Sequence, residues 1–471
     1  MSYELIVCGT GFASSFFLHK WLEKRPGSRV LVLERGPREE HADQVVRQSN
    51  TSVVSSALFT RSGLDSKDWL FTVGLGGGSN CWWAQTPRMW EEDFELKSRY
   101  GVGFDWPISY ADLEPYYDEA ETLMQMAGPD DAPYPRKGPC PQPPHKLSGF
   151  DEAMIAAFPG EWTAAPTGRT SMGTSLRAAC CANGVCGICP VDAKFRVMNE
   201  MAVLYDDTPS VTLKTEAEVL AVEIEAGQAR GVRWRENGRE ETARADLVFM
   251  GMNGLFNPHI LAQSGDTSPL TGRRLVEQAS LKIMVDFENV SGFDGGTHIT
   301  GLGYMFYGGE QRRNRASCIV ENYNAPSLLR SEKGKWLSRA MMKIAAENLP
   351  EDRNRVISDD PDKPVAHFEG HSDYAKRALT QVPDEFVAML DRVSPVEAVH
   401  LDSEIAASEG HIQGTTVMSA DPAQGVVDAT LLHHRIGNLV VGGAGAFPTA
   451  PCANPSLSIS ALSLRSANLL A

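Results

Sequence analysis

An α/β fold with a separate domain built on an antiparallel sheet is predicted by three features of this 471-residue chain. The chain opens with a strand, a glycine turn, a helix and a second strand, "YELIVCGTGFASSFFLHKWLEKRPGSRVLVLERG". It closes with another strand, glycine turn and helix, "NLVVGGAGAFPTAPCANPSLSISALSLRSANLLA". Between them, alternating segments such as "VTLKTEAEVLAVEIEAGQARGVRWRENGRE" and "HITGLGYMFYG" predict strands. The length favours two domains or one large elaborated domain.

The first turn has the pattern of a Rossmann-like dinucleotide site. Gly9 and Gly11 follow the predicted strand Leu5–Val7 in the order G-x-G-x-x-S. Gly9 permits a tight turn, and Gly11 lets the backbone approach a pyrophosphate at the helix N-terminus. Ser14 replaces the third glycine and is small enough for close helix–strand packing. Glu34 ends the second strand, where it can bind ribose hydroxyls, so a dinucleotide is favoured over a nucleotide-free glycine turn.

Two further glycine turns predict a long ligand. The stretch Gly74–Ser79 lies between Trp69 and Trp90 and cannot form a packed strand or a stable helix. A flexible linker is the alternative, but the flanking tryptophans favour contact with a ligand. Near the carboxyl end, the strand Leu439–Val441 is followed by glycines and by a helix that begins near Pro455. Both ends of the chain therefore supply glycine turns to one cofactor.

Together these segments resemble the glucose–methanol–choline (GMC) family of flavin oxidoreductases, especially the catalytic subunits of bacterial FAD-dependent sugar dehydrogenases. The resemblance is carried by "YGVGFDWPISYADLEPYYDEAE", "NLPEDRNRVI" and "FPTAPCANPSLSISALSLRSA", in that order. It implies noncovalently bound FAD, an alcohol or sugar substrate and an electron-carrier subunit as partner. The positions implied to contact FAD are Gly9, Gly11, Phe12, Ala13, Ser14, Glu34, Arg35, Gly77, Gly78, Ser79, Asn80, Cys81, Gly443, Ala444 and Pro455.

The segment "EGHIQGTTVMSADPAQGVVDA" is similar to the family's H-x-x-G-T segment and implies that His411 is the catalytic histidine. Its partner, a histidine or asparagine in the family, corresponds to Asn454. Oxidation of an alcohol by hydride transfer needs a base for the hydroxyl proton, and imidazole suits that role. A neutral donor such as Asn454 can hold the same oxygen as it becomes an alkoxide.

Other residues compete for roles at this site. His367 and His371 lie in "AHFEGHSDY", which alternates like a strand of the substrate sheet, and they could line the pocket or be structural. His433 and His434 are predicted to lie at the surface. Some relatives link the flavin covalently to a histidine, but the aligned position here is Cys81, which excludes a histidyl link. A cysteinyl link is the alternative to a small buried thiol.

Four cysteines lie close together in "RAACCANGVCGICPVDAKF". The spacing C-C-x4-C-x2-C differs from paired zinc knuckles, whereas iron–sulfur clusters use grouped thiolates. The segment resembles the one that holds a 3Fe-4S cluster in the sugar dehydrogenase subunits, and Cys180, Cys181 and Cys186 match its ligands. Cys189 is one residue closer than in that pattern. A vicinal or local disulfide and a metal-free cysteine hairpin remain alternatives.

Composition limits the partners and the location. The formal net charge of −16 argues against a nucleic-acid partner and against an anionic membrane surface. No segment approaches the ~18–20 apolar residues of a membrane span. The first residues lack the charged region of a signal peptide, so a cytoplasmic location is expected.

The motifs predict a discontinuous FAD-binding domain made of residues 1–110, 205–268 and 411–471. Residues 111–204 are expected to cover the cofactor and to carry the cysteine loop, and residues 269–410 to form the substrate-binding domain. The expected function is oxidation of the CH–OH group of a sugar, glycoside or polyol, with electrons passed through a cluster to a carrier. The alternative is an oxygen-using oxidase of a glycoside or natural-product alcohol with structural cysteines. A flavin-binding protein without turnover is the third alternative.

Overall fold

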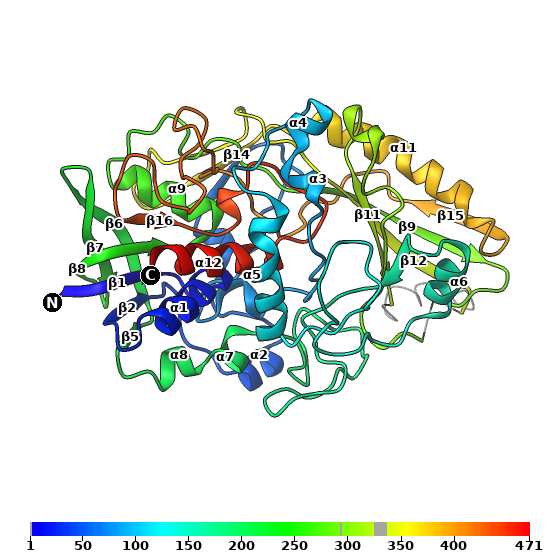
Figure 1. The fold of residues 1–471 in the computed structure, drawn as a ribbon, viewed down its shortest axis with the longest axis horizontal. Coiled ribbons are helices and arrows are strands. Elements are labelled where there is room, and N and C mark those ends of the chain that lie inside the picture. Colours follow the sequence, from blue (N-terminus) through cyan, green and yellow to red (C-terminus); the bar gives the residue numbers. More distant parts are fainter. Residues whose placement is uncertain (1, 293, 325–336) are drawn as a thin grey trace.

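The computed structural model describes residues 2–292, 294–324 and 337–471, and it contains three sheets (Figure 1). The largest has seven strands in the order β5-β2-β1-β8-β7-β6, with β16 beside β8. Its strands are β1 (Ser2–Cys8), β2 (Val30–Leu33), β5 (Val211–Lys214), β6 (Ala217–Glu225), β7 (Gln228–Glu236), β8 (Arg239–Met250) and β16 (Leu439–Val441). The strands β5, β2, β1, β8 and β16 are parallel, whereas β8, β7 and β6 form an antiparallel meander.

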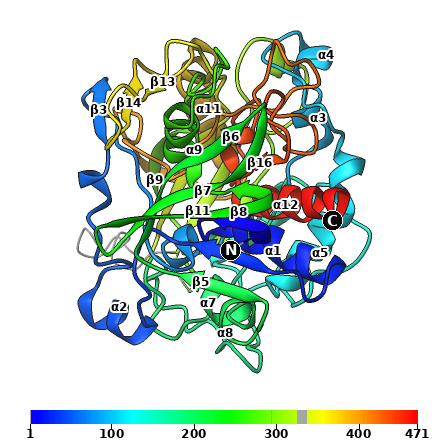
Figure 2. The same ribbon diagram turned by 90° about the vertical axis from the view of Figure 1, so that its left-hand side faces the viewer.

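The parallel part of this sheet is buried because helices cover it. The second half of β1 is Leu-Ile-Val-Cys, and none of these side chains is exposed. Helix α1 (Phe12–Lys24) contacts α12 (Ser456–Leu470), which contacts α5 (Tyr110–Leu123). Helix α9 (Asn253–Gln263) contacts β6. Figure 2, in which the end of the molecule that holds this sheet faces the viewer, shows that both ends of the chain lie on this side.

The second sheet has six antiparallel strands in the order β15-β9-β12-β11-β10-β4. Its strands are β4 (Trp162–Ala164), β9 (Ala279–Phe287), β10 (Ile299–Gly303), β11 (Cys318–Tyr323), β12 (Arg339–Ala346) and β15 (Val396–Leu401). Helix α11 (Asp373–Leu390) packs its apolar side chains on β9 and β12. The strand register places Glu321 beside Lys343, and Lys343 beside Lys282, so three charged side chains form a row across the sheet.

The third sheet corrects one expectation. The segment around His367 was expected in the substrate sheet, but β14 (Val365–Phe368) pairs with β13 (Arg355–Ile357) and β3 (Thr60–Gly63) instead. The extended run is short because Ser372 caps α11, its side chain accepting a hydrogen bond from the amide of Ala375. The strand β4, from the segment expected to cover the cofactor, is an edge strand of the six-stranded sheet.

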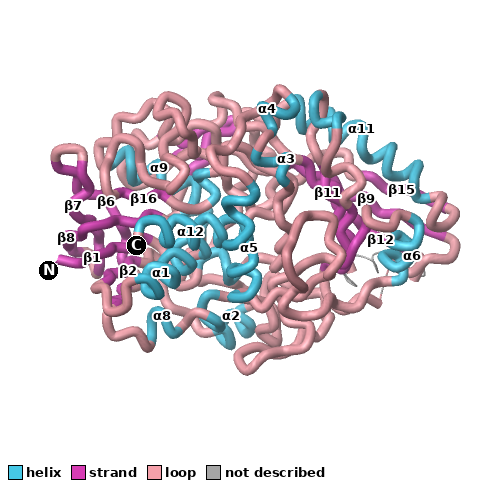
Figure 3. The backbone as a smooth tube through the Cα atoms, in the orientation of Figure 1, coloured by secondary structure: helices cyan, strands magenta, loops and turns pink. Residues whose placement is uncertain are grey.

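Much of the remaining chain is loop, as Figure 3 shows. Between residues 125 and 196 only α6 (Gly149–Ala157) and β4 are regular elements. The short helices are α2 (His41–Arg47), α3 (Glu91–Phe94), α4 (Leu96–Tyr100), α7 (Val197–Glu200) and α8 (Val203–Asp206), with 3-10 turns at Ser55–Ala57, Gly77–Asn80, Glu310–Arg313 and Ala444–Ala446. In the described ranges no helix has the length and apolarity needed to cross a bilayer, and a cytoplasmic location stays a prediction.

Candidate active site

A cavity of about 600 Å³ lies between the seven-stranded sheet and the six-stranded sheet. On one side it is lined by residues that follow the parallel strands, including Gly9 after β1, Glu34 after β2, Gly251 after β8 and Gly443 after β16. Ligands of open α/β sheets bind beyond the carboxyl ends of the strands, where these residues lie. On the other side the cavity reaches β9, β11 and β12 of the antiparallel sheet. The predicted site residues that line it are Gly9, Gly11, Phe12, Ala13, Glu34, Arg35, Gly77, Gly78, Cys81, His411, Gly443, Ala444, Asn454 and Pro455.

The first glycine turn keeps the N-terminus of α1 open. Gly9 has φ +94°, and a Cβ there would lie 2.8 Å from the carbonyl oxygen of Gly251, so both conformation and space require glycine. Gly11 precedes the first residue of α1, and a Cβ there would meet only the backbone nitrogen of Gly78, 4.0 Å away. The free N–H groups of this helix therefore face space in which an anion can lie.

Glu34 is held in place at the end of β2. One carboxylate oxygen accepts a hydrogen bond from the Thr10 hydroxyl (2.6 Å), and the other accepts one from the Gly36 amide (2.9 Å). The amide of Gly76 donates to the same hydroxyl of Thr10 (3.0 Å), which ties the second glycine loop to the first turn. Burial raises the pKa of Glu34, and the hydrogen bonds from Thr10 and Gly36 oppose that shift.

Three of the predicted contact residues fold the turns instead of lining the cavity. Ser14 is buried between β1 and α1, and its hydroxyl donates to the carbonyl oxygen of Cys8 (3.4 Å). Ser79 donates to the Gly76 carbonyl (2.7 Å), and Asn80 donates to the carbonyl of Leu75 (3.0 Å). Small and amide side chains in glycine turns bond to their own loop, which the motif alone does not reveal.

Gln85 lines the cavity and was not predicted. It is buried, and neither of its amide atoms has a hydrogen-bond partner among the described residues. The Oδ1 atom of Asn454 is also buried without a partner in the described part of the chain. Buried polar groups are normally satisfied, so these atoms indicate that a ligand completes the site. The only sequence signal for Gln85 is its place inside the tryptophan-flanked glycine segment.

The imidazole of His411 lines the cavity and is fixed from behind. Its Nδ1 atom is hydrogen-bonded to Oε1 of Gln278. The Nε2 atom of Gln278 donates to the carbonyl oxygens of Pro451 (2.6 Å) and Ala453 (2.9 Å), in the segment that carries Asn454. Burial lowers the pKa of His411 to about 4, and Glu409 opposes that shift. The imidazole is therefore neutral near pH 7 and can accept a proton.

A charged wall adjoins His411 on the side of the antiparallel sheet. The ammonium of Lys343 lies 3.0 Å from a carboxylate oxygen of Glu321 and is also paired with Glu409. The hydroxyl of Tyr323 donates to Glu321 (3.1 Å), and that of Ser280 donates to Glu409. Burial alone would lower the pKa of Lys343, but the carboxylates of Glu321 and Glu409 raise it well above its usual value. Lys343, Glu321 and Glu409 all line the cavity, which gives it a polar end.

The competing histidines lie outside this cavity. His371 is buried against Asn348, at 3.0 Å, and His367 contacts the Ser62 hydroxyl, at 2.8 Å. The expected surface position of His433 is wrong. The side chain of His433 is only 4% exposed. Its Nδ1 atom accepts hydrogen bonds from the backbone amides of Arg435 and Ile436, in the turn that follows it. His434 is half-buried.

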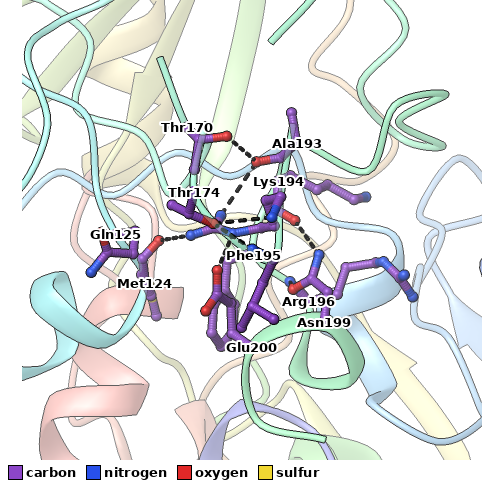
Figure 4. Close-up of polar contacts among 12 residues, drawn as sticks. Met124, Gln125, Thr170, Thr174, Ala193, Lys194, Phe195, Arg196, Asn199 and Glu200 are labelled. Carbon is purple, nitrogen blue, oxygen red and sulfur yellow. Dashed lines mark hydrogen bonds and ion pairs between the residues drawn. The ribbon is translucent and has the colours of Figure 1, made fainter. Parts of the chain in front are cut away.

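The cysteine loop has a closed base, shown in Figure 4. The amide of Thr170 donates to the carbonyl oxygen of Ala193 (3.1 Å). The side chain of Asn199 donates to the carbonyl oxygen of Lys194 (3.0 Å). The buried guanidinium of Arg177 also donates to Ala193 (3.3 Å). The bonds of Thr170 and Arg177 to Ala193 bring the two ends of the loop together, and the four cysteines lie in the segment between them.

The four thiols differ in exposure. Cys181 is exposed and Cys180 half-buried, whereas Cys186 and Cys189 are 8% and 4% exposed. Burial raises the pKa of Cys186, which also senses the charges of Cys180 and Cys189. All nine cysteines are free thiols in this structure, and no three of these four sulfurs lie within 4.8 Å of one another, as ligands of one ion would. Cys186 is thus within electrostatic reach of Cys180 and of Cys189, and Cys181 is exposed.

Two buried cations adjoin these thiols. Arg169 and Lys194 are 1% and 0% exposed, and neither forms an ion pair with a carboxylate of the described residues. The ammonium of Lys194 instead lies against backbone carbonyl oxygens of Asn80 (2.7 Å), Trp82 (3.0 Å), Cys186 (3.2 Å) and Gly187 (2.7 Å). Burial lowers the pKa of Lys194 to about 8, and nearby Cys81 opposes that shift. An unpaired buried charge is costly, so these cations favour a negative group beside them.

Comparison with known proteins agrees with this geometry. Residues 339–463 match the family described as GMC oxidoreductase. The chain is 23% identical to the fructose dehydrogenase large subunit of Gluconobacter japonicus, over 100% of this chain and 98% of that protein. It is 25% identical to paromamine 6'-oxidase of Streptomyces fradiae, over 100% of this chain and 91% of that protein.

Two solved structures share the fold. Pyridoxine 4-oxidase from Mesorbium loti superposes with a TM-score of 0.67 at 17% identity, over 99% of each chain. A formate oxidase from Aspergillus oryzae superposes with a TM-score of 0.66 at 14% identity, over 100% of this chain and 98% of that one. Fold and site therefore define an FAD-dependent oxidoreductase. The chain has the α/β fold of the GMC oxidoreductases, which its residues 339–463 match, and it acts on CH–OH donors.

The cavity residues fit FAD. The open N-terminus of α1 beside Gly11 and Gly78 suits a pyrophosphate, and Glu34 lies where the ribose of an adenosine would bind. The unpartnered amide of Gln85 and the Oδ1 atom of Asn454 offer hydrogen bonds to a polar ring edge or substrate. Cys81 lines the cavity and is half-buried, and its thiol lies 3.5 Å from the carbonyl oxygen of Gly78.

Proposed function

We propose that this protein oxidises a primary or secondary alcohol of a sugar, glycoside or polyol, with FAD held noncovalently in the cavity. The observation that carries the proposal is the neutral imidazole of His411, fixed on one side and facing the cavity beside a charged wall. That wall, formed by Glu321, Lys343 and Glu409, offers donors and acceptors to several hydroxyl groups. Two relatives along the whole chain, named fructose dehydrogenase large subunit and paromamine 6'-oxidase, support a sugar or glycoside donor.

In this proposal His411 removes the hydroxyl proton and the side-chain amide of Asn454 donates a hydrogen bond to the same oxygen. Bound FAD supplies the acceptor for the hydride. Pro455 and Ser456, at the start of α12, line the cavity, and the positive end of that helix favours negative charge on a nearby ring. The seven-stranded sheet with its helices would form the FAD-binding domain, and the six-stranded sheet the substrate-binding domain.

The substrate class is tested by mixing the oxidised protein anaerobically with a panel of alcohols and following loss of the flavin bands. Sugars, glycosides and polyols should reduce the flavin, whereas simple alcohols of equal concentration should do so more slowly, because they leave the charged wall unpaired. Faster reduction by an apolar alcohol would contradict a sugar-type substrate. Flavin that remains with acid-precipitated protein would contradict noncovalent binding and implicate Cys81.

We propose further that the cysteine loop holds a 3Fe-4S cluster that passes electrons to a carrier subunit. The support is the electrostatic influence of Cys180 and Cys189 on Cys186, together with the two buried cations that lack a carboxylate partner in the described ranges. Cluster thiolates would supply the negative charge that Arg169 and Lys194 favour.

The alternative is an oxygen-using oxidase with structural cysteines, which the names of paromamine 6'-oxidase and pyridoxine 4-oxidase favour. A visible spectrum combined with iron and sulfide analysis of anaerobically purified protein separates the two functions. Flavin bands alone, with fewer than about two irons per chain, would exclude the cluster and favour the oxidase.

A further inference from the structure

The side-chain amide of Gln278 is hydrogen-bonded to the Nδ1 atom of His411, on the side of the ring away from the cavity. We propose that Gln278 is a positioning residue that holds His411 in the tautomer with the proton on Nδ1, so that the lone pair of Nε2 faces the cavity. The same amide anchors the segment that carries Asn454. This inference rests on the proposed role of His411 as the base.

The hydrogen bonds of Gln278 determine which way its amide points. Its Nε2 atom donates to the carbonyl oxygens of Pro451 and Ala453, at 2.6 and 2.9 Å. Turning the amide over would place its oxygen against two other oxygens and lose both bonds. The Oε1 atom must therefore face His411. Because this oxygen only accepts hydrogen bonds, the Nδ1 atom of His411 has to carry a proton.

The backbone around this contact is held firmly. The backbone amides of Val276 and Gln413 donate to each other's carbonyl oxygens, at 3.0 and 2.9 Å. This bridge joins the segment just before Gln278 to the segment just after His411. Gln278 is buried, which shields its bonds from water. In the described part of the chain, no polar atom is bonded to Nε2 of His411, although the ring lines the cavity. The free nitrogen is thus available to a substrate hydroxyl.

The uncharged amide matters because charged groups surround the ring. Glu409 raises the pKa of His411 and Lys343 lowers it. The carboxylate of Glu277 accepts a hydrogen bond from the backbone amide of His411 (2.8 Å) and is paired with Lys67. A carboxylate in place of Gln278 would stabilise the protonated imidazole, which cannot act as a base. The amide orients the ring without adding that charge. Burial then keeps the pKa of His411 low.

The test combines a spectroscopic readout with a pH profile. In protein labelled with ¹⁵N-histidine, the His411 signals, assigned by their loss in His411→Gln, should show a protonated Nδ1 and an unprotonated Nε2 at pH 7. Gln278→Glu should move the acid limb of anaerobic flavin reduction to higher pH by at least one unit. Gln278→Leu should keep FAD, show mixed tautomers, and reduce the flavin about 10–100-fold more slowly.

Gln413→Leu is the matched control, because Gln413 is buried two residues after His411 and its side-chain amide has no partner among the described residues. Its pH profile should equal that of the wild type. A protonated Nε2 in the wild type, or an unmoved acid limb in Gln278→Glu, would overturn the inference. If the Gln278 variants do not fold, the wild-type tautomer decides alone. If His411 is not the base, the result is different: the His411→Ala variant still reduces its flavin at close to the normal rate.

Discussion

The His411 site and the cysteine loop both bury polar groups, but they differ in whether the chain itself satisfies those groups. Around His411, Gln278 and the carbonyls of the Asn454 segment satisfy the imidazole from behind, and Lys343 lies between two carboxylates. Around the cysteines, Lys194 is bonded only to backbone carbonyl groups, without a carboxylate partner in the described residues. The first region is complete apart from its cofactor and substrate. In the second region the described carboxylates Glu200 and Asp192 pair with Arg177 and Arg196, which leaves Lys194 without a negative partner.

The largest expected effect tests the first region. His411→Ala should retain FAD, because the glycine turns and Glu34 are untouched, yet anaerobic flavin reduction by substrate should slow roughly 10²–10⁴-fold. Stopped-flow absorbance measures this rate. His371→Ala is the control, since His371 is a buried histidine that does not line the cavity, and it should reduce at close to the normal rate. Equal loss in both variants would assign the effect to folding.

The next prediction tests which thiols the second region uses. Cys189→Ser should remove iron, whereas Cys181→Ser should retain it, because Cys189 is buried with Cys186 and Cys181 is exposed. Iron and sulfide analysis on anaerobic protein gives the result. Reduction of the flavin by substrate should persist in both variants. The opposite pattern would restore the ligand set Cys180, Cys181 and Cys186 that the sequence motif implied.

Lys194→Met distinguishes a charged occupant of the loop from an uncharged one. If thiolates or a cluster lie beside Lys194, its removal should lower the free energy of unfolding by about 3 kcal/mol, because a buried charge loses its partner. If the loop is uncharged, the same change should leave stability unchanged or raise it. Denaturant unfolding of protein with measured iron content decides between the two. Lys214→Met, at a half-buried surface ion pair, serves as the control and should have little effect.

The smallest effect is on pH dependence. The pKa of His411 is lowered to about 4, so flavin reduction should be nearly constant above pH 5 and fall as the imidazole becomes protonated below it. The neutral form is the base, and for that reason activity is lost towards acid. The same shift means that the unfolded chain, with an ordinary histidine, takes up the proton first, so stability also falls between pH 6.5 and pH 4. An acid limb centred near pH 6.5 would show that His411 is hydrated.

Local motifs were predictable from the sequence, and long-range partners were not. The first turn with Glu34, the strand Leu439–Val441 and the helix after Pro455 each depend on neighbours within a few residues, and all three were correctly placed. The segment around His367 was misassigned because its partner, β3, is some 300 residues away and leaves no local signal. Gln85 and Gln278 were missed for the same reason. A buried glutamine looks ordinary in sequence, and only its distant hydrogen-bond partners reveal a role.

The strand order of the central sheet also determines when the amino-terminal segments can complete their packing during synthesis. Strand β1 begins at the second residue, but β8, beside it, and β16, beside β8, come from residues 239–250 and 439–441. Helix α12, which packs on α1, comes from residues 456–470. Until residues 439–470 have been made, the nascent chain therefore leaves uncovered the edge of β8 that β16 joins and the face of α1 that α12 covers. Because Gly443 and Pro455 line the same cavity as Gly9, the FAD site is complete only after the segment that carries them has folded, and a chain that stops short of α12 would present an apolar face of α1 to chaperones and proteases.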